Sequence, residues 1–150
     1  MSLLTVASQA SVWRGYEYFS EKRVLEFSQI SDFEIKGVIR GDAQKRYEVF
    51  IDIEHPRKSK CNCPHADGKR IVCKHMIALF FHAYPKEAKE YYEEVMRYEL
   101  EEEERHEELE EKIFAYIKNL TKEELENHLI DLIFSGPEWQ YEKFCDTYIE

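Results

Sequence analysis

The sequence predicts an α+β protein in which a small antiparallel β-sheet comes first and an acidic, all-helical region follows. Three observations support this prediction. Apolar and polar residues alternate along the first third of the chain, whereas apolar residues recur with a helical period after residue 73. The charge also divides, because residues 1–84 hold 13 Lys and Arg against 10 Asp and Glu, and residues 85–150 hold 8 against 21. We therefore expect two domains, residues 1–84 and residues 85–150.

The composition narrows the class of protein. Hydrophobic residues make up 43% of the 150 residues, with only 5 Gly and 4 Pro, which is typical of a globular chain and not of a disordered one. The longest apolar run, residues 76–81, is far shorter than the roughly 20 residues that cross a membrane. No basic N-terminal region precedes an apolar segment. We expect an unsecreted, cytoplasmic protein without a membrane partner.

The chain is expected to begin with a helix and then to form strands. Residues 5–19 are rich in Ala, Ser and aromatic side chains, which predicts a short helix that ends near Gly15. Rough alternation predicts strands at residues 23–30 and 33–39, with a Ser-Asp turn between them. Strands joined by so short a turn pair in an antiparallel manner.

A third strand and a buried helix follow. Apolar side chains alternate with mostly polar ones from Tyr47 to Ile53, which predicts a strand with one buried face. From Cys73 onward the pattern is helical, and apolar residues occupy more than half of the circumference. This helix should end before Pro85, since the residue that precedes a proline disfavours the helical region.

A long helix is predicted to begin at Pro85, because proline suits the first helical position. Steps of four and three residues from Ala88 trace a seam that is apolar at both ends and polar in the middle. The run from Glu101 to Glu104 is its water-facing section. We interpret the segment as a solvated helix, with homodimerisation through the ends of the seam as the alternative.

Two shorter helices are expected to complete the C-terminal region. Thr121 and Glu124 have the spacing of a capping box, which starts a helix. Gly136 and Pro137 end that helix and begin the next one. Residues 85–150 should therefore form an acidic unit of one long helix and two shorter ones.

Three cysteines and a histidine lie within a short stretch, as Cys61-x-Cys63, nine residues, then Cys73-x-His75. In a chain without a secretory signal this arrangement favours a metal over disulfides. Four protein ligands of this kind satisfy zinc in a closed tetrahedron, so we expect one structural Zn²⁺. It would clamp the sheet to the buried helix. His65 is the alternative ligand, but its place beside Pro64 favours a plain loop residue.

The ligand pattern resembles that of the SWIM zinc-finger family, whose signature is Cys-x-Cys, a variable gap and Cys-x-His. An apolar helix after Cys73-Lys74-His75 and the upstream Arg14-Gly15-Tyr16 are similar to prokaryotic members, and the resemblance covers roughly residues 12–84. It implies a module that binds nucleic acid or protein. It also implies a partner such as a helicase-like ATPase or a recombination factor.

Basic residues surround the predicted zinc site, and Asp67 is the only nearby acid that we expect. Such side chains make salt-dependent contacts with phosphate, so we expect a non-enzymatic module that binds DNA through this face and a partner protein through its acidic helices. The predicted nucleic-acid contacts are Arg57, Lys58, Lys60, Lys69, Arg70 and Lys74.

The net charge of −10 supports a different hypothesis, because it repels polyanions at long range. The chain is then an adaptor that binds only proteins, and the lysines merely solvate the surface beside a structural metal. Catalysis is not expected, since the sequence contains no nucleophile elbow, phosphate-binding loop or paired-carboxylate motif.

Overall fold

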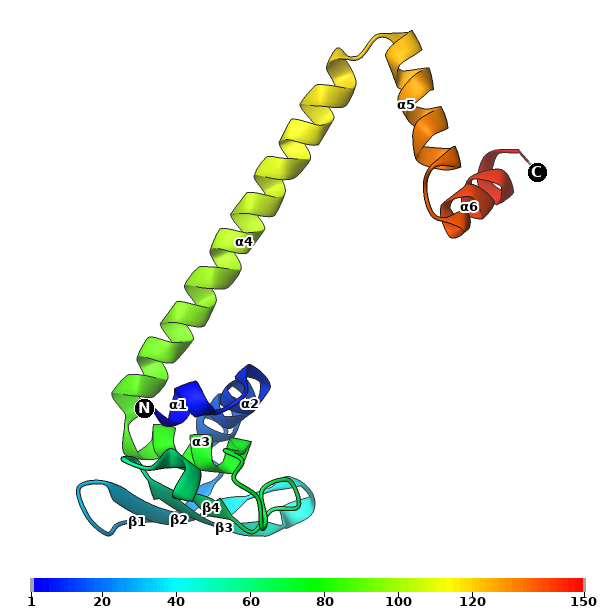
Figure 1. Cartoon of the computed structure of the whole chain (residues 1–150). Coiled ribbons are helices and arrows are strands. Elements are labelled where there is room, and N and C mark those ends of the chain that lie inside the picture. Colours follow the sequence, from blue (N-terminus) through cyan, green and yellow to red (C-terminus); the bar gives the residue numbers. More distant parts are fainter. Residues whose placement is uncertain (1, 150) are drawn as a thin grey trace. The chain divides into compact units, whose positions relative to one another are not determined.

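The computed structural model describes residues 2–149 and confirms the α+β class, with a four-stranded sheet first and helices after it (Figure 1). The contacts divide the chain into two compact units, one up to Met96 and one from Arg97 onward. The elements in order are α1 (Leu3–Val6), α2 (Gln9–Ser20), β1 (Val24–Gln29), β2 (Glu34–Arg40), the 3-10 turn η1 (Asp42–Gln44), β3 (Arg46–Asp52), the 3-10 turn η2 (Pro56–Lys58), β4 (Lys60–Cys61), α3 (Lys74–Ala83), α4 (Pro85–Asn119), α5 (Lys122–Phe134) and α6 (Glu138–Tyr148).

The sheet is an antiparallel meander in the order β1-β2-β3-β4, and its first three strands confirm the predicted ones. Alternate residues of β2 and β3 point to one face, where Ile35, Ile39 and Ile51 are fully buried. The fourth strand has only two residues and was not predicted. Its pairing of Cys61 with Val49 brings the first cysteine to the buried face of the sheet.

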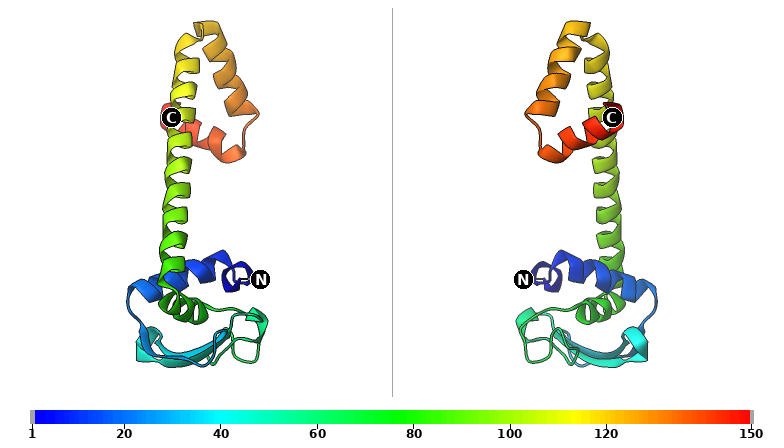
Figure 2. Two further views of the ribbon diagram at one scale, coloured as in Figure 1. Left: turned by 90° about the vertical axis from the view of Figure 1, so that its left-hand side faces the viewer. Right: turned by 90° about the vertical axis from the view of Figure 1, so that its right-hand side faces the viewer.

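Helix α3 packs on that face of the sheet, and α2 packs on α3 (Figures 1 and 2). The prediction for α3 is confirmed, since it ends at Ala83 and is buried from His75 to Phe81. The prediction that the first helix ends near Gly15 is wrong, because α2 continues to Ser20. Gly15 instead permits close packing of α2 on α3. A Cβ atom there would lie 2.4 Å from the Cβ of Ile77.

The first turns of α4 belong to the N-terminal unit. Ala88 is buried, and the ring of Tyr92 stacks on that of Tyr16 with centroids 5.2 Å apart. Tyr91 packs on Phe81 with centroids 5.6 Å apart. The N-terminal end of the predicted seam therefore contacts its own domain.

The C-terminal unit contains the rest of α4, together with α5 and α6. The predicted capping box is confirmed, since the Thr121 hydroxyl accepts from the backbone N–H of Glu124 and the Glu124 carboxylate accepts from the N–H of Thr121. Between Arg97 and Ile149 only Ile133 is buried. No helix within residues 2–149 is both long and apolar enough to cross a membrane.

Candidate metal centre

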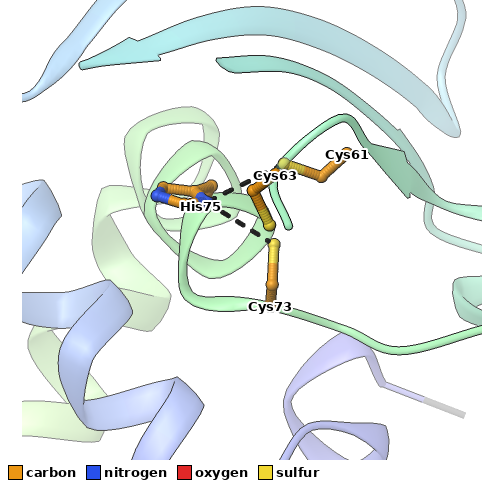
Figure 3. Close-up of side chains that lie close together, drawn as sticks. All are labelled: Cys61, Cys63, Cys73 and His75. Atoms are coloured by element: carbon orange, nitrogen blue, oxygen red, sulfur yellow. Dashed lines mark hydrogen bonds between the residues drawn. The ribbon is translucent and has the colours of Figure 1, made fainter. Parts of the chain in front are cut away.

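Four side chains from two segments meet beside the start of α3 (Figure 3). Cys61 ends β4, and Cys63 follows it in a turn that is closed by bonds from the N–H groups of Ala66 and Asp67 to the Cys63 carbonyl. Cys73 is the N-terminal cap of α3, and His75 lies in its first turn. The structure therefore brings together all four predicted ligands.

The geometry of the cluster fits a tetrahedral metal. Its four ligand atoms lie within 4.8 Å of one another, and all four residues are buried. The Nδ1 atom of His75 lies 3.8 Å from the Sγ atoms of Cys61 and Cys73 (Figure 3). A zinc ion at about 2.3 Å from sulfur and about 2.0 Å from nitrogen separates its ligand atoms by roughly 3.5–3.8 Å. The cluster is a Cys3His site for one structural zinc ion.

The thiols of the cluster compete for negative charge. A hydrogen bond to Cys73, followed by burial, raises the pKa of Cys61, whereas the same bond lowers the pKa of Cys73 to about 4. Burial, and then the charge on Cys73, raises the pKa of Cys63. A divalent cation removes this competition, since zinc binds its cysteine ligands as thiolates.

Aromatic rings hold the imidazole of His75 in place. The ring centroids of Tyr47 and Tyr18 lie 4.6 and 5.4 Å from that of His75. Since Nδ1 faces the sulfur atoms, it is the nitrogen that would bind the metal. In the described part of the chain, neither His75 Nε2 nor the Tyr18 hydroxyl has a hydrogen-bond partner of ordinary geometry, and both atoms are buried.

A second cluster of charges packs on Tyr18. The Arg23 guanidinium and the Lys74 ammonium lie 4.0 and 4.3 Å from the centre of its ring. Both cations also bind Asp42, at 3.0 and 3.3 Å. The pKa of Asp42 falls to about 2, first because of Arg23, then through the nearby Tyr18 hydroxyl, and then through Lys74. No sequence motif pointed to Tyr18, Arg23 or Asp42, because these residues are far apart in the chain.

Five of the six predicted nucleic-acid contacts lie together. Arg57, Lys58, Lys60, Lys69 and Arg70 are exposed and line one open groove of about 1690 Å³. Among residues 2–149, none of the five forms an ion pair. Lys74 is different, because it does not line this groove, is half-buried and binds Asp42.

Acidic residues share the groove, which the sequence did not make evident. It contains six acids against six Lys and Arg, the sixth cation being Lys36. Three of the acids have partners of their own, and one of these is Glu34, which accepts a hydrogen bond from the Ser31 hydroxyl at 3.4 Å. Glu26 lies 3.5 Å from Arg46, and Asp52 accepts from the backbone N–H of His55 at 2.8 Å. The groove acids are Glu26, Glu34, Glu48, Asp52, Glu54 and Asp67.

Comparison with known proteins identifies the segment that holds the metal site. A family model for the SWIM zinc finger matches residues 47–84, which include all four ligands. This segment is a SWIM zinc finger domain. No curated protein and no solved structure matches the chain.

The SWIM finger extends from β3 to the end of α3. Its core is not confined to the matched segment, because α2, β1 and β2 also contribute residues that pack with α3. These upstream elements lie outside the matched segment, although the resemblance in sequence had suggested a start near Val12. The match identifies a zinc-binding module and no catalytic domain.

Proposed function

We propose that this chain is a non-enzymatic module that binds DNA through the exposed cations of the groove, as part of a larger complex. The observation that supports this most strongly is the convergence of five exposed cations from two loops. Arg57, Lys58 and Lys60 precede the first ligand pair, and Lys69 and Arg70 precede the second pair. Because one metal ion joins both pairs, it also holds the two basic loops together.

The chemistry of the loops suits a phosphate backbone. Lys and Arg side chains that neutralise phosphates release counterions, so binding weakens steeply as salt rises. The whole chain carries a net charge of −10, which opposes DNA at long range. At physiological salt, charges beyond about 8 Å are screened, and the local cluster then determines the contact.

Reversing the groove charges tests the proposal. In low salt, the zinc-loaded chain should bind a labelled DNA duplex, and changing Lys58, Lys60, Lys69 and Arg70 to Glu should abolish the fluorescence anisotropy change. The matched control reverses four exposed cations of the same unit that do not line the groove: Arg14, Lys22, Lys45 and Lys86. Equal losses in both variants, or no binding by the unmodified chain, would reject the proposal.

The mixed charge of the groove favours a second candidate function, an adaptor that binds only protein. The six acids among its lining residues suit a peptide with alternating charges better than a uniform polyanion. Under this alternative, reversing the acids and reversing the cations should both weaken the same protein complex, and DNA should not compete. By family resemblance, the first partners to test are a helicase-like ATPase and a recombination factor.

A further inference from the structure

The C-terminal unit exposes an unusual amount of apolar surface. Between Ile113 and Ile149, thirteen large apolar side chains are 39–73% exposed, and we call them together the distal apolar surface. Single exposed apolar residues are ordinary, but a concentration of this kind marks an interaction site. It lies on the last turns of α4, on α5 and on α6.

The helices that carry this surface are encoded locally but have little to pack on. Thr121 caps α5 with a complete capping box, and Pro137 precedes α6. The two helices have 13 and 11 residues, and isolated helices shorter than about 12–15 residues are marginal in water. Their stability must therefore come from packing against another surface.

The exposed area is large enough for a stable interface. Five aromatic residues, namely Phe114, Tyr116, Phe134, Trp139 and Tyr148, are 57–73% exposed. A fully exposed aromatic side chain offers roughly 150–250 Å², so these five present about 500–800 Å² per chain. A stable interface of standard size buries about 800 Å² on each partner, and the aliphatic residues of the surface add to the aromatic total.

The charge of this region permits a second copy of the same chain as the occupant. Residues 112–149 hold four Lys against seven Asp and Glu, so two such surfaces repel each other only weakly. Residues 99–111 instead hold nine Glu against one Arg, which keeps that section of two α4 helices apart. In a two-fold interface the same patch of each copy packs on the other, so both copies would supply the same apolar residues.

We propose that the distal apolar surface is a homodimer interface, in which α5, α6 and the end of α4 from two copies bury one another. Since Ala88 and Tyr92 already pack within the N-terminal unit, the dimer uses only the C-terminal end of the α4 seam. The proposal does not depend on DNA binding. A dimer would give each assembly two SWIM fingers, and therefore two linked contacts with any repetitive ligand.

Sedimentation equilibrium of the full zinc-loaded chain tests the proposal. We expect twice the mass of one chain at micromolar concentration, and helicity that falls together with dimer dissociation on dilution. The double variant Phe134→Glu with Trp139→Glu should be monomeric at the same concentration. The matched control, Tyr98→Glu with Leu100→Glu, changes two exposed apolar residues of α4 outside the surface and should remain dimeric.

Zinc content keeps the result interpretable if the double variant loses helix. One zinc per chain shows that its N-terminal unit is folded, so that loss of helix together with loss of the dimer supports the proposal. A monomeric unmodified chain at its highest soluble concentration overturns the proposal. So does a dimer that survives the double variant, or one that the control disrupts equally. If the chain is monomeric and binds another protein through this surface, that protein is the occupant and the proposal is wrong.

Discussion

The two units of this chain reach stability in different ways. Of the twenty apolar residues that are buried in the described part of the chain, nineteen lie before Arg97 and only Ile133 lies after it. The N-terminal unit combines a sheet, a buried helix and a metal site around one core. The C-terminal unit has well-capped helices and almost no core. The first unit therefore buries a core within one chain, whereas the described part of the second buries a single apolar residue.

Loss of zinc should lower the stability of the chain more than any other change, and the loss of structure should be confined to the N-terminal unit. Structural zinc contributes on the order of 10 kcal/mol to the folding of small finger domains. We expect Cys61→Ser with Cys73→Ser to eliminate bound zinc and the near-ultraviolet circular dichroism of the first unit. Cys145→Ser is the control, since Cys145 lies outside the metal cluster. If the first unit remains folded without zinc, the claim that zinc stabilises it is wrong, and so is the contrast between the two units.

Truncating a leucine in each unit should sharpen the comparison. Leu79 is fully buried on α3, and Leu129 is 50% exposed on α5. Leu79→Ala should cost the first unit about 2–5 kcal/mol of unfolding free energy, through lost burial and a cavity. Leu129→Ala should leave that unit unchanged, within about 0.5 kcal/mol. Denaturant unfolding followed by tryptophan fluorescence in a Trp139→Phe background, where only Trp13 emits, measures both effects. Similar losses of unfolding free energy in the two variants would contradict the division into two units.

Gly15→Ala tests how closely α2 and α3 pack. The added methyl group would lie 2.4 Å from the Cβ of Ile77 and 2.9 Å from the backbone oxygen of Lys74, so one helix must move. Overpacking of this kind costs about 1–3 kcal/mol, which thermal unfolding would detect. The control is Gln9→Ala at the exposed start of the same helix, and it should have little effect. An unchanged melting temperature for Gly15→Ala would contradict the close packing.

Removing the cap of α5 should have the smallest effect, limited to the C-terminal unit. Thr121→Ala removes the hydroxyl that accepts from Glu124, at a cost of about 1 kcal/mol. Hydrogen exchange should then accelerate in α5 and remain unchanged in α3. The backbone N–H of Thr121 also lowers the pKa of Glu124, so this part of the cap is present at neutral pH and is lost as the pH falls through that lowered pKa. Acceleration in α3 would show that the units are coupled.

Local patterns predicted much of this structure. Alternation located three strands, and the apolar run after Cys73 located α3. The capping box correctly predicted the residue at which α5 begins. The metal cluster was also predictable, because Cys-x-Cys and Cys-x-His place two ligands on each of two short segments that one ion joins. Each of these features depends on residues that are close together in sequence.

Features that depend on distant residues were not predicted. Gly15 indicated a helix end, because its contact with Ile77 on another helix has no signal in the local sequence. The charge cluster of Arg23, Asp42 and Lys74 on Tyr18 joins α2, η1 and α3 only in the folded chain. For the same reason, Lys74 was predicted to contact nucleic acid together with the groove cations, although it binds Asp42 instead. The sequence also did not show that Glu48 lines the same groove as these cations.

The central claim is that the two loops joined by zinc present one basic contact surface. The salt dependence of DNA affinity tests this claim most directly. Five phosphate contacts predict a slope of about −4 to −5 for the logarithm of affinity against the logarithm of salt, at roughly −0.9 per contact on duplex DNA. Reversing Lys58, Lys60, Lys69 and Arg70 should abolish measurable binding, whereas the four control reversals should preserve the slope. Undetectable binding of the unmodified chain in low salt, or a slope that the groove reversals leave unchanged, would contradict the claim.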